Sequence, residues 1–307
     1  MEASGGVVTP GTGVREGEKE REEARAAARR GPRRNWVRPL LMWIAVIFIC
    51  VFCLFPFYWL INTSLKTGPD LSTSALVPPS PTLDNYQSVL QNDDFVRALL
   101  NSTIVSLVVT ALSLVVGSFC AYALARLKLR GKFWILALIL SITTFPAIAI
   151  AAPIFKLWTD AGLFNTLVGL IIPYLCFSLP LAIYILVSFF KEIPRDLEEA
   201  ALVDGATNFQ AFTKIVIPLA APGMATTAIL TFIFAWNEFL LAVTLTSSPK
   251  ARTVPAAIAF FTGSTEFEKP LGTISAASVI ISIPLILLVL FFQKRIVAGL
   301  TAGAVKG

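Results

Sequence analysis

The sequence predicts an all-α integral membrane protein with six transmembrane helices and a short additional helix on the cytoplasmic side. Hydrophobic residues make up 56% of the 307 positions and charged residues only 14%, far below the share in soluble domains. Six mostly apolar runs each exceed the roughly 20 residues that a helix needs to cross about 30 Å of hydrocarbon. They occupy residues 40–62, 98–125, 133–155, 166–190, 215–248 and 271–293.

Proline residues indicate where these runs bend. Prolines inside the apolar runs each remove a backbone donor and favour a kink, namely Pro146, Pro153, Pro173, Pro180 and Pro284. The fifth run is longer than one crossing needs, and Pro218 and Pro222 lie near its start. Its first part is therefore expected at the membrane surface.

The distribution of positive charge predicts the orientation. Of the 25 Lys and Arg residues, 19 fall in segments on the same side as the N-terminus and 6 on the other side. Cytoplasmic loops carry an excess of Lys and Arg, so both termini of this multi-pass protein are expected in the cytoplasm. The basic residues are distributed by membrane side and not gathered into one face, so nucleic acid is not an expected partner.

Three parts are expected along the chain. Residues 1–37 form a cytoplasmic tail, and its mixture of Glu and Arg favours disorder. This tail is too long and too acidic for a cleaved signal peptide. Residues 38–300 form the six-helix membrane domain, and residues 301–307 form a second cytoplasmic tail.

A polar segment between the fourth and fifth runs carries a spaced motif. Glu199-Ala200-Ala201 is followed by Asp204-Gly205 and, after nine further residues, by Ile215-Val216-Ile217-Pro218. Pro194 and Asp196 favour a helix start, and Gly205 permits a backbone turn that other residues resist. The segment predicts a short amphipathic helix that is followed by a second one over residues 207–214.

This spacing resembles the signature of bacterial ABC-importer permeases, with Ile217 where the family usually has Leu. Two shorter elements, Thr82-Leu83-Asp84-Asn85-Tyr86 and Asn101-Ser102, resemble the sugar-importer branch and extend the likeness over residues 38–300. The Ala-rich and Arg-rich tail is similar to that of mycobacterial trehalose permeases. No residue, however, distinguishes trehalose from maltose or another oligosaccharide.

The resemblance implies a permease subunit of an ATP-driven carbohydrate importer in the bacterial plasma membrane. Its implied partners are a second homologous permease, two ATP-binding subunits, an extracellular solute-binding protein, the sugar and the lipid bilayer. The residues that the resemblance assigns to ATPase coupling are Glu199, Ala200, Ala201, Asp204, Gly205, Ile215 and Pro218.

Neither a cofactor nor an enzyme activity is expected of this chain. The phosphate-binding spacing G-x-x-x-x-G-K-[ST] is absent, so ATP and Mg are expected at the partner ATPase subunits. The sequence contains four Cys but no His, so no zinc pattern and no metal site are expected.

Glu238 is the only charged residue inside the six apolar runs. An ionised side chain there costs on the order of 3 kcal/mol, so it should face protein or water. Trp236, Asn237 and Glu238 combine an aromatic face with an amide and a carboxylate, which suits a sugar in a translocation pathway. The alternative is a buried polar pair that fixes helix contacts.

The last long loop before the sixth run contains Thr253, Val254 and Pro255, and the resemblance implies that it contacts the extracellular binding protein. Two other classes of protein remain as alternatives. An ion-coupled secondary carrier would need a relay of intramembrane acids or His, whereas this chain offers one Glu. A non-transporting membrane scaffold would not need the complete motif.

Overall fold

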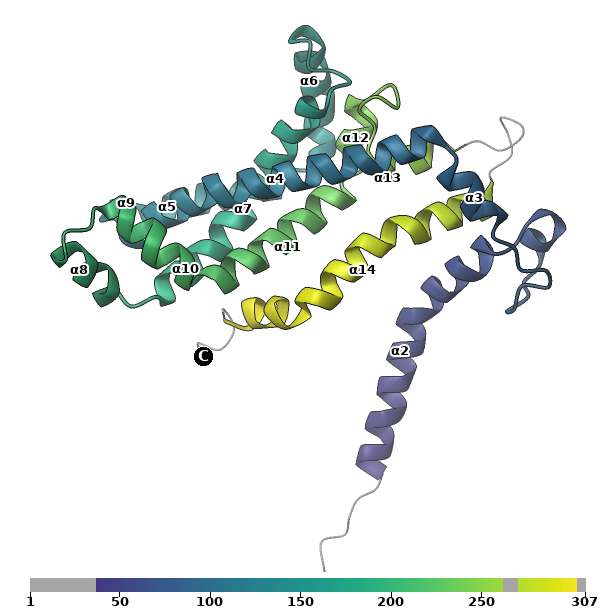
Figure 1. Ribbon diagram of the computed structural model, residues 1–307, viewed down its shortest axis with the longest axis horizontal. Coiled ribbons are helices and arrows are strands. Elements are labelled where there is room, and N and C mark those ends of the chain that lie inside the picture. Colours follow the sequence, from purple (N-terminus) through teal and green to yellow (C-terminus); the bar gives the residue numbers. More distant parts are fainter. Residues whose placement is uncertain (1–36, 262–269, 303–307) are drawn as a thin grey trace, which may run out of the picture. The chain divides into compact units, whose positions relative to one another are not determined.

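The computed structural model describes residues 37–261 and 270–302, and every regular element in these ranges is a helix. The chain divides into two compact units, Met1–Phe57 and Tyr58–Gly307; Figure 1 shows the helices in sequence colours. Within the described residues, four helices are long and apolar enough to cross a membrane, or up to six if each of two bent pairs is one span. The prediction of an all-α membrane protein is confirmed.

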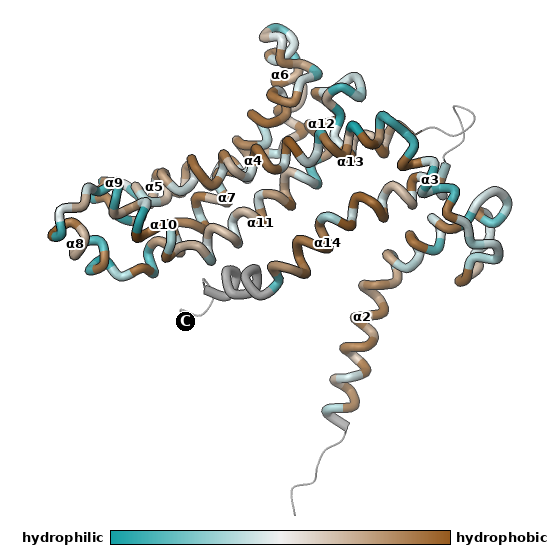
Figure 2. The backbone as a smooth tube through the Cα atoms, in the orientation of Figure 1, coloured by the Kyte–Doolittle hydropathy of each residue, from teal (hydrophilic) through white to brown (hydrophobic). Residues whose placement is uncertain are grey.

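Helix α2 (Val37–Ser64) provides the first candidate span, over Pro39–Ser64. The part of α2 that belongs to the first unit is mostly apolar, as the brown tube in Figure 2 shows. Pro56 lies inside this helix without ending it. The apolar run predicted over residues 40–62 therefore forms one continuous helix.

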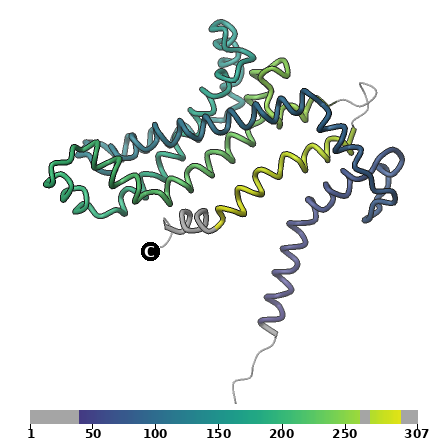
Figure 3. The backbone as a smooth tube through the Cα atoms, viewed as in Figure 1, coloured from purple at the N-terminus to yellow at the C-terminus, as the bar shows by residue number. Residues whose placement is uncertain are grey.

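Three helices form the core of the second unit (Figure 3), namely α4 (Asp93–Arg126), α7 (Leu167–Glu192) and α11 (Ala221–Asn237). The hydroxyls of Ser113 and Ser178 lie 2.8 Å apart and join α4 to α7. A Cβ atom at Gly223 would overlap the ring of Phe189, so glycine permits α11 to approach α7 closely. Close packing and hydrogen bonds of this kind are what hold helices together in lipid.

Two bends interrupt the remaining spans. Helices α5 (Lys132–Ser141) and α6 (Ala147–Asp160) are separated by the short η2 (Ile142–Thr144) and by Phe145 and Pro146. The pair bends by 86° because both connecting residues have extended backbones, as expected at and before proline. The second bent pair, Asn208–Leu219 with Ala221–Asn237, bends by 75°. The predicted kink at Pro146 is confirmed, whereas the helices continue through Pro153 in α6, Pro173 and Pro180 in α7, and Pro284 in α14 (Leu271–Ala302). The bend after Leu219 separates the first part of the fifth run from the rest, and the place of that part at the membrane surface stays a prediction.

A cluster of hydrogen bonds lies near the N-terminal end of α4, next to α3 (Asp84–Leu90) and η1 (Gly68–Ser72). Asn85 donates to the carbonyls of Ser64 and Lys66 at 2.9 and 2.8 Å, and it accepts from Thr273 of α14 (Leu271–Ala302) at 3.3 Å. Tyr86 lies 2.7 Å from the Ser64 hydroxyl. The Asn-Tyr pair of the sugar-importer element therefore joins three separate segments.

Candidate functional site

The polar segment with the spaced motif folds into two short helices joined by a turn. The elements in order are α8 (Asp196–Val203), α9 (Asn208–Ala211), the π-helical turn η3 (Phe212–Val216) and α10 (Ile217–Leu219). Three acidic side chains occupy the first turn of α8, which suits the positive end of a helix dipole. Gly205 adopts a φ of +88°, and Thr207 starts α9 with a capping box to Gln210. The predicted helix start and the predicted turn are confirmed.

The residues assigned to ATPase coupling lie at or near the surface of this segment. Exposed are Glu199, Ala200, Asp204, Gly205 and Pro218, while Ala201 and Ile215 are half-buried. Large apolar side chains of α8 and α9 are exposed beside them, and we call these four the docking surface: Leu197, Leu202, Val203 and Phe209. Val203 is 87% exposed. An apolar group of this size on a helix pair at the end of the bundle is available to a partner protein.

The opposite side of α8 carries Glu198, for which the sequence predicts no role. Glu198 is buried, and its Oε1 lies 2.6 Å from Arg126 Nε at the C-terminal end of α4. Tyr122 of α4 donates a hydrogen bond to Glu198 Oε2 at 3.1 Å. These residues are more than 70 positions apart in sequence, so helical periodicity gives no signal for their contact. The sequence signals for this contact are a basic residue, Arg126, directly after an apolar run and the adjacent acidic residues Glu198 and Glu199.

The prediction that the fifth span continues through Glu238 is wrong. Helix α11 ends at Asn237, and Glu238 has an extended backbone with ψ of 125°. Its carboxylate accepts hydrogen bonds from the backbone N–H groups of Leu241 and Ala242 at 2.8 and 3.1 Å. It therefore caps the first turn of α12 (Leu240–Leu245), which explains why the helix breaks at this residue.

The three residues assigned to the translocation pathway have different environments. Trp236 is only 3% exposed and stacks on Phe232, with 5.5 Å between the ring centroids. Its Nε1 has no hydrogen-bond partner among the described residues. Asn237 is exposed and Glu238 is half-buried. Within this chain, only the second and third residues present polar atoms outside the packed core.

The loop around Thr253 is anchored by hydrogen bonds to side chains of α4. Asn101 donates its side-chain amide to the carbonyls of Pro249, Lys250 and Arg252 at 3.0 to 3.3 Å. The Ser102 hydroxyl accepts from the backbone N–H of Val254 at 2.8 Å. The Asn-Ser pair that resembles the sugar-importer branch thus holds the segment that leads into α13 (Val254–Ala259).

This anchoring changes the assignment of the contact loop. Thr253 and Val254 are 2% and 0% exposed, and Pro255 is half-buried. The side chains of Thr253 and Val254 face the core because hydrogen bonds hold the loop against α4. They are therefore unavailable to a partner protein in this conformation. The exposed side chains within residues 249–261 are those of Lys250, Ala259 and Phe260.

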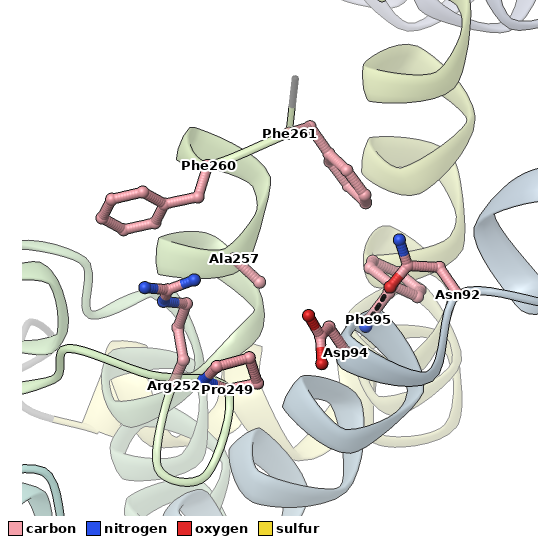
Figure 4. Close-up of a pocket in the computed structure, with 8 residues that line it drawn as sticks. All are labelled: Asn92, Asp94, Phe95, Pro249, Arg252, Ala257, Phe260 and Phe261. Atoms are coloured by element: carbon pink, nitrogen blue, oxygen red, sulfur yellow. Dashed lines mark hydrogen bonds between the residues drawn. The ribbon is translucent and has the colours of Figure 1, made fainter. Parts of the chain in front are cut away.

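A small polar pocket of about 70 Å³ opens beside this loop (Figure 4). Asp94 and Arg252 lie on opposite sides of it, with the rings of Phe260 and Phe261 above. The Arg252 guanidinium lies 3.9 Å from the centroid of the Phe260 ring. Burial lowers the pKa of Arg252, and the nearby Asp94 charge opposes that shift. A guanidinium is protonated in proteins at ordinary pH. The pocket presents a cation and an anion together.

A second pocket, of about 310 Å³, has a different character. It lies between α6 and α7, and its lining includes Ile154, Trp158, Ile172 and Phe177. The lining offers a sugar no charged or amide side chain, so the pocket suits apolar contacts. Among the described residues, no group of three or more Cys, Asp or Glu side chains is placed to hold a metal ion.

These features define a class of protein: a polytopic helical membrane subunit with an exposed helix pair at one end of α4 and an anchored loop at the other (Figure 1). The chain belongs to the family of binding-protein-dependent transport system inner membrane components, whose sequence profile matches residues 113–301. The predicted membership of the ABC-importer permeases is confirmed. As a permease subunit the chain is not itself an enzyme, because the ATPase of such transporters is a separate subunit.

Comparison with individual proteins gives the same result. The chain is 51% identical over 256 residues to the trehalose transport system permease protein SugB of Mycobacterium tuberculosis (strain CDC 1551 / Oshkosh), over 83% of this chain and 93% of that protein. It is 42% identical over 277 residues to the trehalose/maltose transport system permease protein MalG of Thermococcus litoralis, over 90% of this chain and 99% of that protein.

A solved structure shares the fold. It is a bacterial ABC transporter involved in the import of the acidic polysaccharide alginate. The TM-score is 0.73 at 24% identity, over 86% of this chain and 98% of the matched chain. At this level of identity the likeness concerns the arrangement of the helices.

Proposed function

We propose that this chain is one of two permease subunits in an ATP-driven importer for a di- or oligosaccharide, with trehalose as the first candidate. The observation that carries the sugar class is the 51% and 42% identity to permeases named for trehalose and for trehalose and maltose. The second permease is a homologue of this chain, and the two bundles enclose the cavity. ATP and Mg bind to two separate ATPase subunits.

The docking surface on α8 and α9 is the contact with the ATPase. Its support is the exposure of Val203, Leu202 and Phe209 beside the exposed Glu199. An amphipathic helix that lays apolar side chains into a groove is a common mode of protein recognition. The positive φ of Gly205 lets α8 turn sharply back toward α9 and present this surface as a compact knob.

The orientation follows from the charge distribution. Both termini and the α8–α9 pair lie in the cytoplasm, because most Lys and Arg residues share that side. Helix α4 has 34 residues, a length of about 51 Å at 1.5 Å per residue, so its two ends reach opposite sides of a bilayer. The anchored loop and the polar pocket beside it therefore face the extracellular side.

The extracellular binding protein docks on that side. Thr253 and Val254 shape the loop from within, Pro255 lies at its margin, and the exposed Lys250 and Phe260 make the contact. The polar pocket between Asp94 and Arg252 lies next to this surface and offers charge to polar groups of the partner. Aromatic residues and Arg are enriched in protein interfaces, which suits this role.

Transport is a shift between inward-facing and outward-facing packings of the two permeases. ATP-driven closure of the ATPase pair moves the docked helices and favours the outward-facing state, and hydrolysis restores the inward-facing one. A shift from 1:99 to 99:1 needs about 5.5 kcal/mol of differential interaction. Asn237 and Glu238 line the pathway with polar atoms, while the buried Trp236 supports them from the core.

The proposal is tested with the complete importer in vesicles, that is, with both permeases, the ATPase and the binding protein. ATP-dependent uptake of labelled trehalose is compared with uptake of maltose and of an unrelated amino acid. We expect sugar uptake that requires both ATP and the binding protein. Amino-acid uptake without sugar uptake would contradict the sugar assignment.

Docking is tested separately by crosslinking. Val203→Cys, in a chain whose four native cysteines are replaced by alanine, should crosslink to a cysteine in the groove of the ATPase. Val77→Cys is the matched control, because Val77 is also highly exposed but precedes α3 at the other end of α4. A crosslink to the ATPase from Val77 and none from Val203 would contradict both the docking and the orientation.

A further inference from the structure

Helix α8 is joined to α4 by a buried ion pair. The side chains of Arg126 and Glu198 are only 6% and 11% exposed, and the charged atoms approach to 2.6 Å. Arg126 also donates from Nη2 to the carbonyl of Ile193, which follows the last residue of α7, at 2.8 Å. One guanidinium thus connects the ends of two long helices to α8. Two contacts at once from Nε and Nη2 of one planar group are specific to arginine.

An aromatic cluster makes a second connection beside the ion pair. Phe212, the first residue after α9, is buried between α4 and α7. Its ring centroid lies 4.7 Å from that of Tyr122, 5.2 Å from that of Phe119 and 6.4 Å from that of Phe190. Tyr122 takes part in both connections, because its hydroxyl bonds to Glu198. The two short helices are therefore fixed to the bundle at two points.

The far end of α4 is fixed as well. Asn101 and Ser102 hold the loop over residues 249–254 through four hydrogen bonds. A single helix consequently makes direct contact with α8 at its C-terminal end and with the anchored loop near its N-terminal end. A continuous helix moves as a rigid body more readily than it bends, so displacement at one end is felt at the other.

We infer that the Arg126–Glu198 ion pair is the joint through which movement of α8 passes into α4, and hence to the anchored loop. The inference rests on the proposed docking of α8 to an ATPase. Glu198 and Arg126 are positioning residues in this scheme, because neither faces the docking surface. Loss of either charge leaves the other buried without its partner, which loosens α8 from the bundle while its exposed face is unchanged.

The experiment measures the number of sugar molecules imported per ATP hydrolysed by the complete importer in vesicles. Glu198→Gln and Arg126→Gln are each expected to lower this ratio by about fivefold or more, the lower end of ordinary allosteric coupling. The double variant Arg126→Gln with Glu198→Gln should lose no more than the worse single variant, because the two residues act as one pair. Losses that add up in the double variant would overturn the inference.

Two controls separate a joint from a merely structural contact. Glu192→Gln makes the same chemical change at an exposed carboxylate near the end of α7, and the ratio should stay unchanged. Arg126→Lys keeps the charge but loses the fork, and an intermediate ratio is expected. An unchanged ratio in both Glu198→Gln and Arg126→Gln would overturn the inference.

Crosslinking distinguishes failure of the joint from failure of docking. In the Val203→Cys background, Glu198→Gln should retain the crosslink to the ATPase while the transport ratio falls. A parallel loss of crosslink and ratio would mean that Glu198 only holds the shape of α8, which overturns the inference but leaves docking intact. Absence of the crosslink from the chain with Glu198 and Arg126 unaltered would overturn the proposed docking itself, and the inference with it.

Discussion

Glu198 and Glu199 are neighbours in sequence, but their side chains have opposite environments. Glu198 is buried in an ion pair with Arg126, whereas Glu199 is exposed on the side of α8 that is free of the bundle. Adjacent residues on a helix point about 100° apart, so one acidic pair can serve two surfaces. One carboxylate belongs to the interior of the permease and the other is available to a partner.

Glu199→Gln should weaken association with the ATPase and leave the transport ratio of the assembled importer unchanged. The reason is that the exposed carboxylate contributes to an interface, where a charge-assisted hydrogen bond is worth about 1.5–3 kcal/mol. We expect a loss of affinity of about tenfold, measured by titrating detergent-solubilised permease pairs with the ATPase. A reduced transport ratio at saturating ATPase would contradict this division of roles between Glu198 and Glu199.

Gly205→Val should reduce ATP-driven uptake strongly, while Gly205→Asn should retain most of it. Gly205 has a φ of +88°, and no atom lies within 4 Å of the position that a Cβ would occupy. A side chain at this position therefore meets no clash, and its cost comes from the positive φ. That cost is about 1–2 kcal/mol for valine and less for asparagine, which adopts positive φ more readily. Equal uptake by Gly205→Val and Gly205→Asn would show that the turn at Gly205 is not needed.

Gly205→Pro, which cannot adopt a positive φ, should abolish sugar-stimulated ATP turnover.

Glu238→Ala should lower the thermal unfolding midpoint of the purified permease pair, because α12 loses the acceptor of two backbone N–H groups. Loss of a helix cap costs about 1 kcal/mol. Thr244→Val is the control, since Thr244 bonds only to Leu240 within the same helix.

Glu238→Gln keeps one acceptor oxygen and should change uptake kinetics more than stability. Unaltered uptake of every sugar would remove Glu238 from the pathway.

Asn101→Ala should release the anchored loop. Three carbonyl groups lose their shared donor, and one such hydrogen bond contributes about 0.5–1.5 kcal/mol net. Hydrogen–deuterium exchange over residues 249–256 should become faster by about tenfold or more. Thr103→Val on the same helix removes only a bond to Leu99 and should leave exchange unchanged. Unchanged exchange in Asn101→Ala would contradict the anchoring.

Much of the fold follows from local properties of the sequence. Apolar run length and the spacing of Lys and Arg are local or summed quantities, so they predict the membrane class and the candidate spans. Pro146 predicts a bend because its missing N–H acts on its own helix, and Gly205 predicts a turn for a similarly local reason. Residues 1–37 and 301–307, assigned to tails, lie largely outside the described residues.

The parts that escaped sequence reasoning depend on contacts between distant segments. Polarity within an apolar run suggested that Glu238 lies inside a span, but its carboxylate instead ends the helix by bonding to the next turn. The resemblance implied that the loop with Thr253 and Val254 contacts a partner protein, but hydrogen bonds to α4 hold these two side chains in the core. The pairing of Arg126 with Glu198 likewise depends on how α4 and α8 pack, which no local pattern encodes.

The bonds of Asn101 also bear on how the protein is made. Its amide binds carbonyls that lie 148 to 151 positions later in the chain. The ribosome must therefore synthesise the chain beyond residue 249 before this amide meets its acceptors, and until then the bundle is incomplete and the amide lacks its native partners. Premature termination ahead of residue 249 would yield a nascent chain that inserts into the bilayer but leaves this polar group without its native acceptors.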